Sequence, residues 1–336
     1  MKKTLSAVLL TAFSVLCLCA GEQLWDGSLD TVKLTSGNKL KDVSVKTEDG
    51  VLDVSATSEG PSVTYVSVEI RVKPFKLAGK SLAFDVWSDQ PKTTDAFYVR
   101  LQDAKRRNIL SFQQWNTPLK AQPENRFVQP GFSNRLMRWE ATEIKADENT
   151  DADRIVFFIG SRGDGKKMSL KIRNIELADA AALPEKPAGK AVPSNGVGCV
   201  SAAALDNGVL TVKTLVVDPG IIYTFTTIPF SGSLAGKKLV LTAGVDVPNV
   251  VGAFYVRGYN AKKQCILSYK SWTKELKTEP RTFTFTPGQN SSGLGWEADR
   301  VTKDADQQLA SLEIITGCSK QYKKQFTLTV RDIRLE

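Results

Sequence analysis

The sequence predicts an all-β protein built from two tandem antiparallel β-sandwiches. The first observation is a duplication: Ala96–Arg100 reappears as Ala253–Arg257, at an offset of 157 residues, and 11 of the 20 positions are identical between 96–115 and 253–272. The second is an apolar period of two in short segments rich in β-branched and aromatic residues, bounded by Gly, Pro, Asn and Asp. No convincing amphipathic helix interrupts them, which favours a pair of sandwiches.

The N-terminal residues 1–20 have the pattern of a secretory signal peptide. Two lysines precede an apolar stretch that is too short and wrongly flanked for a membrane span. No later stretch approaches the ~20 apolar residues of a transmembrane helix. We therefore expect an exported protein with a bacterial-type signal, either secreted, periplasmic or on the cell surface. Cleavage after Ala20 and lipid anchoring at Cys17 or Cys19 both stay open.

The duplication divides the chain into a first repeat over 21–178 and a second over 196–336. Residues 179–195 are rich in Ala and Pro, a composition that predicts a semi-stiff linker. The strands expected in the first repeat are Val51–Ala56, Ser62–Val72, Ser81–Trp87, Ala96–Asp103, Ile109–Trp115, Arg154–Gly160 and Ser169–Leu177. The clearest in the second are Lys238–Leu241, Ala253–Tyr259, Cys265–Trp272 and Thr327–Leu335.

Each repeat closes on a similar strand, Leu170–Leu177 and Leu328–Leu335, with the pattern apolar-x-apolar-x-Asn/Asp-Ile-x-Leu. Such a strand, after a Trp-bearing strand and an acidic loop, resembles the galactose-binding-like jelly roll of many carbohydrate-binding modules. The resemblance implies a jelly-roll topology for both sandwiches, and sugar binding as the expected function.

Composition narrows the chemistry. The chain has no histidine, which excludes Ser-His-Asp and Cys-His catalysis and histidine-ligated zinc. No pair of carboxylates is clearly placed as acid and base for glycoside hydrolysis. The net charge of +9 becomes +7 without the two lysines of the signal peptide, and no nucleic-acid-binding motif is present. We therefore expect that the protein is neither an enzyme nor a nucleic-acid-binding protein. We also expect it to be a monomer.

Cofactors and disulfides are not expected to hold the fold. Cys199, Cys265 and Cys318 all lie in the second repeat, so the duplicated unit does not depend on disulfides. The acidic run 147–153 offers oxygen ligands such as Ca²⁺ takes, but lacks the spacing of a dedicated loop. No metal ligand is therefore assigned, and a structural calcium ion stays open.

The candidate binding site is one face of a hairpin. Along Ala96–Asp103 alternate residues point to opposite sides, so Phe97, Val99 and Leu101 should face the core. The opposite side, joined by the next strand and with Trp87 as a further candidate, gives the predicted ligand-binding residues Tyr98, Arg100, Gln102, Gln113, Trp115 and Trp87. The equivalent residues of the second repeat are Tyr255, Arg257, Tyr259, Lys270 and Trp272.

Aromatic rings beside hydrogen-bonding groups suit sugars, whose C–H faces stack on rings while their hydroxyls take polar partners. The sequence thus favours an exported, non-catalytic protein that binds polysaccharide through one sheet face of each repeat. A structural interpretation stays open, in which the face is covered and Arg100 pairs with Asp85 or Glu140. The chain would then be a structural or adhesive envelope protein that uses its sandwiches as spacers or as protein-interaction domains.

Overall fold

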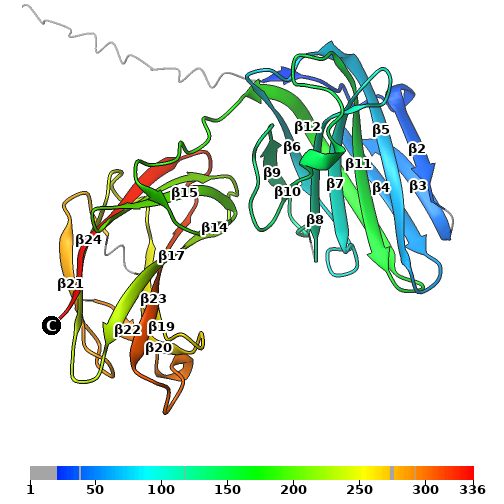
Figure 1. The fold of residues 1–336 in the computed structure, drawn as a ribbon. Coiled ribbons are helices and arrows are strands. Elements are labelled where there is room, and N and C mark those ends of the chain that lie inside the picture. Colours follow the sequence, from blue (N-terminus) through cyan, green and yellow to red (C-terminus); the bar gives the residue numbers. More distant parts are fainter. Residues whose placement is uncertain (1–20, 38, 117, 273–275, 292) are drawn as a thin grey trace, which may run out of the picture.

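The computed structural model describes residues 21–336 except 38, 117, 273–275 and 292. The predicted signal peptide, its cleavage point and Cys17 and Cys19 lie outside the described residues. Over the part described, the two repeats form separate β-sandwiches that follow one another along the chain (Figure 1). All strand pairs within the sheets are antiparallel, which confirms the predicted fold class of two tandem jelly-roll β-sandwiches.

The first repeat consists of two six-stranded sheets. One has the order β3-β4-β12-β6-β9, with β1 paired to β12, and the other β10-β8-β7-β11-β5-β2. The strands of the first sheet are β1 (Glu22–Gln23), β3 (Leu40–Glu48), β4 (Val51–Ser58), β6 (Lys80–Trp87), β9 (Glu124–Val128) and β12 (Lys167–Asp179). Those of the second are β2 (Val32–Ser36), β5 (Val63–Phe75), β7 (Ala96–Asp103), β8 (Asn108–Trp115), β10 (Arg138–Trp139) and β11 (Ala152–Arg162).

The second repeat has the same construction, with sheets β13-β15-β16-β24-β18-β21 and β14-β17-β23-β19-β20-β22. The former contains β13 (Lys190–Ala191), β15 (Cys199–Asp206), β16 (Val209–Val216), β18 (Leu239–Val245), β21 (Arg281–Phe285) and β24 (Gln325–Leu335). The latter contains β14 (Ser194–Val197), β17 (Ile221–Ser233), β19 (Ala253–Tyr259), β20 (Cys265–Ser271), β22 (Gly295–Trp296) and β23 (Gln308–Ser319). Three short 3₁₀ turns complete the described elements: η1 (Leu29–Thr31), η2 (Ala141–Glu143) and η3 (Ala298–Arg300).

The alternation along the central hairpin is as predicted. Phe97, Val99 and Leu101 are fully buried in the first core, and Phe254 and Val256 are equally buried in the second. Consecutive residues of a strand project to opposite faces, so the residues between them project from the outer side of the sheet. The direction of the candidate site residues on β7 and β19 is therefore fixed by the core.

A bulge explains the polar residue of the closing motif. Asn174 in β12 and Asp332 in β24 have φ values of 53° and 55°, the left-handed region that Asn and Asp tolerate better than other non-glycine residues. The register of each closing strand with its neighbour shifts at this point, as a β-bulge requires. The motif Asn/Asp-Ile is therefore a backbone requirement of the unit.

The predicted linker is docked on the first repeat. Gln129 donates to the Ala181 carbonyl at 2.7 Å and accepts from the Ala181 amide at 2.9 Å, while Leu183 packs against the first core. The segment expected to be linker also holds β13 and the start of β14. The connection is therefore shorter and more ordered than its composition predicted.

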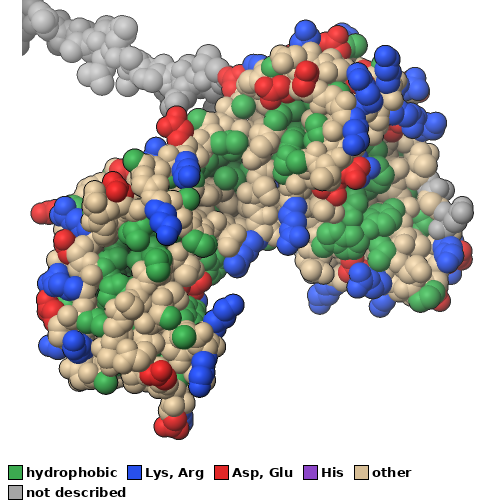
Figure 2. Space-filling model, in the orientation of Figure 1, with side chains coloured by type: hydrophobic (Ala, Val, Ile, Leu, Met, Phe, Trp, Pro, Cys, Tyr) green, Lys and Arg blue, Asp and Glu red, His purple; other side chains and the backbone are tan. Residues whose placement is uncertain are grey.

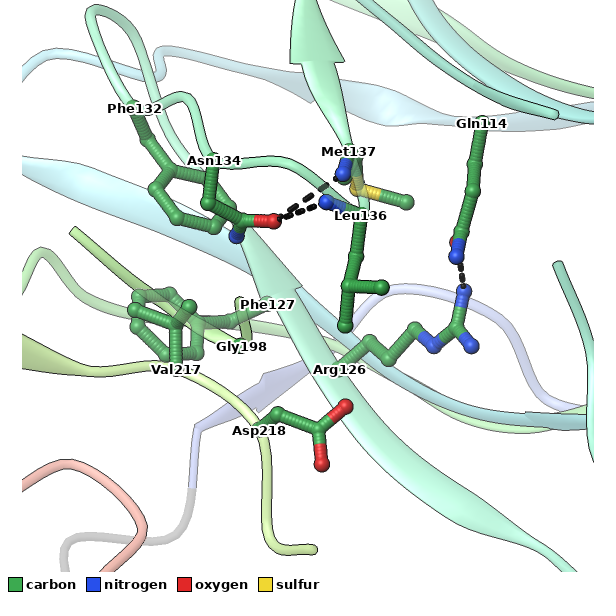
Figure 3. Close-up of a pocket in the computed structure, with 10 residues that line it drawn as sticks. All are labelled: Gln114, Arg126, Phe127, Phe132, Asn134, Leu136, Met137, Gly198, Val217 and Asp218. Atoms are coloured by element: carbon green, nitrogen blue, oxygen red, sulfur yellow. Dashed lines mark hydrogen bonds between the residues drawn. The ribbon is translucent and has the colours of Figure 1, made fainter. Parts of the chain in front are cut away.

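The two repeats share a packed junction. The first core continues into Leu215 and Val217 of the second repeat. The Tyr322 ring lies 5.7 Å from that of Phe127, and its hydroxyl donates to Asn125 at 2.8 Å. Figure 3 shows residues of both repeats around a cavity at the junction. The cavity has a volume of about 20 Å³, which is room for about one water molecule. The repeats are therefore held against each other by side chains as well as by the linker.

Charge is dispersed over the face of the molecule that Figure 2 shows. On the face shown in Figure 2, Lys and Arg side chains alternate with Asp and Glu around small apolar areas. Among the described residues, no helix is long and apolar enough to cross a membrane.

Candidate functional site

The candidate site lies on the outer face of the sheet β10-β8-β7-β11-β5-β2. Residues that face each other across an antiparallel pair project to the same side. Tyr98 stands opposite Gln113 on β8 and Phe158 on β11. Trp115 stands opposite Ala96, and Tyr65 on β5 stands opposite Gly160 of β11. Three aromatic side chains thus come to one area of the face from three different strands.

We call Tyr65, Tyr98 and Trp115 the first triad. The two tyrosine ring centroids are 5.7 Å apart, and the Trp115 ring lies 6.2 Å from Tyr65 and 6.0 Å from Tyr98. The tryptophan ring is inclined at 84° and 68° to the tyrosine rings. The three rings therefore form an aromatic corner, in which the plane of the tryptophan ring is steeply inclined to the planes of both tyrosine rings.

The second triad, Tyr223, Tyr255 and Trp272, repeats this arrangement. Its centroid distances are 6.2, 5.8 and 6.1 Å, and the tryptophan is again inclined at 82° and 76° to the two tyrosines. The agreement extends beyond residue identity to the mutual geometry of three side chains. Each repeat therefore presents one aromatic corner on its outer face.

A glycine supports each triad. A β-carbon placed at Gly160 would stand 2.7 Å from two ring carbons of Tyr65, and one at Gly317 would stand 2.9 and 3.0 Å from two ring carbons of Tyr223. Neither glycine has a positive φ, so its role is to leave room for the ring. The tyrosine ring consequently lies close against the backbone of the glycine.

A polar network lies beside the first triad. Arg100 contacts Glu140 at 3.6 Å, and the fully buried Ser111 donates to the same carboxylate at 2.6 Å. The Arg100 guanidinium also lies over the Phe158 ring, 5.2 Å from its centroid. Of the two partners expected for Arg100, Glu140 is confirmed and Asp85 is wrong: Asp85, on β6 in the other sheet, instead contacts Arg173.

The second repeat rebuilds the network with one more acid. Arg257 contacts Glu297 and Glu313, both at 3.7 Å, and Ser268 donates to Glu297 at 2.8 Å. Burial opposes ionisation of Glu297, but the hydrogen bonds from Ser268 and Lys270 outweigh it and lower its pKa. Both arginines are thus engaged by glutamates, so they hold the face in shape rather than standing free for a ligand.

Three tyrosines of the triads, Tyr98, Tyr223 and Tyr255, have raised pKa values and so stay protonated at neutral pH. Burial raises the pKa of Tyr223 to about 12 and also raises that of Tyr98 and Tyr255. The Tyr65 and Tyr98 hydroxyls lie 3.3 Å apart and share a hydrogen bond. A protonated phenol both donates and accepts, so each triad offers hydroxyl groups beside its apolar rings.

Of the other predicted ligand-binding residues, two lie beside a triad and two lie farther from it. Gln113 accepts from the Trp115 indole at 3.3 Å, and Lys270 contacts Glu297 at 3.1 Å beside the second triad. Tyr259 donates to Glu313 at 3.1 Å, and Gln102 donates to Asn108 at 2.8 Å at the far end of the hairpin. The last two therefore border the site as structural neighbours.

Trp87 does not share the face. It lies on β6 in the other sheet and projects from that sheet's outer side, with Arg173 over its ring at 5.5 Å. Alternation fixes the side of a strand on which a residue stands, but not the sheet to which the strand belongs. In the second repeat its place is taken by Gly244. A β-carbon at Gly244 would lie only 3.0 Å from the Cα atom of Pro280.

Exposure differs between the triads. The three exposed large hydrophobic residues in the described part of the chain are Leu29, Ile221 at 57% and Trp272 at 48%. Ile221 precedes Tyr223 by two residues on β17 and so projects from the same face. Tyr98, Trp115 and Tyr255 are half-buried. The second triad is therefore the more open one, because its own Trp272 is exposed and the exposed Ile221 lies on the same face.

The described residues include no group of three Asp, Glu or Cys side chains able to hold a metal ion. In the acidic run, Asp147 instead accepts from the Asn149 amide at 3.0 Å and from the Thr150 hydroxyl at 3.1 Å. That is the bonding of an ordinary turn. The three cysteines of the second repeat are buried thiols.

Sequence reasoning missed Tyr65 and Tyr223. They are related by an offset of 158, close to the offset of the hairpin, and each lies on a strand that reaches the triad through β11 or β23. The paired glycines Gly160 and Gly317 were a second signal. Together these four residues could have extended the predicted face by one strand.

No protein-family model and no curated protein matches the chain. Solved structures similar to about half of it include the family 11 carbohydrate-binding module of a cellulosomal cellulase of Clostridium thermocellum, at 14% identity over 48% of this chain and 96% of that one, with a TM-score of 0.32. The family 30 module of another cellulase of that organism is 10% identical over 48% and 98%, with a TM-score of 0.32. An agarase is 12% identical over 49% of this chain and 25% of its own length, with a TM-score of 0.34.

Carbohydrate-binding modules are thus among the structural neighbours of the chain, as the sequence resemblance predicted, and a polysaccharide-degrading enzyme is another. With TM-scores well below 0.5, the likeness carries no argument about a ligand or an activity. Any functional conclusion has to come from the residues of the two triads.

Proposed function

We propose that the chain is an exported, non-catalytic protein that binds polysaccharide through its two aromatic triads. The observation that supports this most is the duplicated corner of two tyrosines and one tryptophan on the outer face of each repeat. Aromatic residues combine apolar rings with polar tips, the two kinds of contact that a sugar ring needs. The same geometry kept in both copies is more than a covered sheet face requires.

The non-catalytic part of the proposal rests on the state of the acids. Glu140, Glu297 and Glu313 are each committed to an arginine or a serine, and the pKa of Glu297 is lowered. A glycosidase needs a carboxylic acid that is protonated and free to reach the scissile oxygen. The bridged glutamates beside the triads do not meet that requirement, because each is held by an arginine or a serine.

The test is the retention of the protein, without residues 1–20, on a panel of insoluble and immobilised polysaccharides. We expect retention on at least one glycan and no release of reducing ends. Failure to bind any member of a broad panel by a folded protein would reject the proposal. It would favour the alternative of a structural or adhesive envelope protein, whose exposed Ile221 and Trp272 would then contact protein.

A further inference from the structure

A polar groove runs along the junction between the repeats. It lies between the edge strands of the two triad sheets, β10 beside β8 in the first repeat and β14 beside β17 in the second. Its lining includes Ser133, Asn134, Arg135, Arg138, Ser194 and Asn195. Arg138 on one side and Ser194 and Asn195 on the other therefore belong to the sheets that carry the triads.

Strand register places one lining residue of the groove on each triad face. Arg138 stands opposite Gln113, which stands opposite Tyr98. Across the groove, Asn195 stands opposite Phe225, in the strand that also carries Tyr223. Because opposed residues share a side, Arg138 extends the first face to its edge and Asn195 begins the second.

The turn before β10 aims Arg135 at the second repeat. Asn134 accepts from the amides of Leu136 and Met137 at 2.6 and 3.0 Å (Figure 3). The Arg135 amide then donates to the Gly196 carbonyl at 2.9 Å, and its guanidinium lies 4.8 Å from the centroid of Phe225. A guanidinium stacked on a ring keeps its N–H edge available for an anion.

The groove is electropositive by composition. No Asp or Glu lines it, and neither Arg135 nor Arg138 has a carboxylate of a described residue within ion-pairing distance, whereas Arg100 and Arg257 each do. Both arginines are exposed. The second repeat has Gly295 where the first has Arg138, so this charge belongs to the junction and not to the duplicated unit.

We propose that the groove binds an acidic unit of the polysaccharide, a carboxylate or a sulfate ester, between the two aromatic contacts. This rests on the proposed function and makes its ligand class an anionic glycan. Arginine forks match the paired oxygens of a carboxylate or a sulfate and hold them through charged hydrogen bonds. A single chain that lies on one triad face and crosses the edge strands meets these two guanidinium groups next.

The experiment compares the binding of the wild-type protein and of R135Q/R138Q to polygalacturonate, dextran sulfate and uncharged hydroxyethylcellulose and dextran. We expect the wild type to bind at least one acidic polymer about tenfold or more tightly than the uncharged ones, as two charged hydrogen-bonding groups permit. The double variant should lose that preference and keep the binding to uncharged polymers. Polygalacturonate and dextran sulfate separate a carboxylate site from a sulfate site.

The matched control is K237Q/K238Q, which removes the same charge from an exposed turn of the second repeat. It should bind like the wild type, and an equal loss in both variants would overturn the proposal by showing a general effect of net charge. R138Q alone leaves the Arg135–Phe225 stack intact and should lose about threefold, which guards against a disturbed junction. Equal binding of acidic and uncharged polymers by the wild type would overturn the inference and leave the proposed function standing. Binding of neither acidic polymer would also overturn the inference, and the proposed function is rejected only if the broad panel fails as well.

Discussion

The Tyr65 ring lies over Gly160 so closely that a single methyl group at Gly160 would come within 2.7 Å of two ring carbons. The same relationship links Tyr223 to Gly317 in the second repeat. A side chain of any size at the glycine would lift the ring from the sheet. The glycines thus determine how close one tyrosine ring of each triad lies to the sheet.

Gly317→Ala should therefore weaken glycan binding by about tenfold or more, since a displaced ring loses its stacking contact. The stability cost should be about 1–3 kcal/mol, because Tyr223 must shift to relieve the overpacking. Titration calorimetry and thermal unfolding measure the two effects. Gly252→Ala is the matched control: a β-carbon there has no neighbour closer than 4.0 Å, and the variant should bind normally. Normal binding by Gly317→Ala would show that the Tyr223 ring makes no contact with the glycan.

Asp103 should make the first repeat sensitive to acid. Burial would raise its pKa, but hydrogen bonds from Arg107 and from the Lys105 amide outweigh this and lower it. The carboxylate therefore stabilises the fold fully above its unfolded pKa of about 3.9, and this contribution is lost as the pH falls through the lower folded value. Unfolding of the wild type below about pH 4 should show this loss.

Asp103→Asn should remove that acid-dependent component at a cost of about 0.5–1.5 kcal/mol at neutral pH, from the weakened Arg107 contact. The second repeat already has Asn260 at this position, where its side-chain oxygen accepts from the Lys262 and Gln264 amides, both at 3.0 Å. Denaturant unfolding at pH 7 and at about pH 3 measures both effects. An unchanged pH dependence in the variant would show that Asp103 does not contribute to it.

Binding should be independent of pH across the neutral range. The chain has no histidine, the pKa of Tyr223 is raised to about 12 and that of Glu297 is lowered. Neither of these two groups changes its charge between about pH 6 and 9, so the dissociation constant for an uncharged glycan should vary less than about twofold. A clear inflection within that interval would reveal a titrating group in the site and contradict the described chemistry.

The junction between the repeats should couple their unfolding. Tyr322 contacts Phe127 and Asn125 of the first repeat, and burial raises its pKa. Tyr322→Ala removes the ring and leaves a cavity; because Tyr322 is half-buried, the change should cost less than the roughly 3–5 kcal/mol of a fully buried aromatic side chain. Calorimetry should show one cooperative transition in the wild type and two in the variant. Two transitions in the wild type would mean that the junction does not couple the unfolding of the two repeats.

The sequence predicted the parts of the structure that local alternation controls. The inward direction of Phe97, Val99 and Leu101, and hence the outward one of Tyr98 and Arg100, follows from the period of two in a single strand. Alternation along one strand could not place Trp87, because the assignment of a strand to a sheet depends on pairing between segments far apart in the chain. Tyr65 stayed hidden for the same reason, since β5 meets β7 only through β11.

The junction was beyond the reach of sequence patterns. Arg135 and Asn134 lie in an irregular loop before the two-residue strand β10, and Tyr322 lies in a turn between β23 and β24. Loops carry no periodic signal, and their contacts are set by how the two sandwiches pack. The Ala- and Pro-rich composition of 179–195 predicted a semi-stiff linker, and composition alone could not show that Gln129 and Leu183 hold it against the first repeat.

The most direct measurement is a titration of the best-binding polysaccharide into W115A, W272A and the double variant, with thermal unfolding alongside. We expect W272A to lose about thirtyfold or more in affinity, the loss typical of an aromatic hot spot, and its stability to change little because Trp272 is half exposed. W115A should lose both affinity and some stability, and the double variant should not bind. Wild-type affinity in a folded double variant would contradict the claim that the two triads form the binding sites.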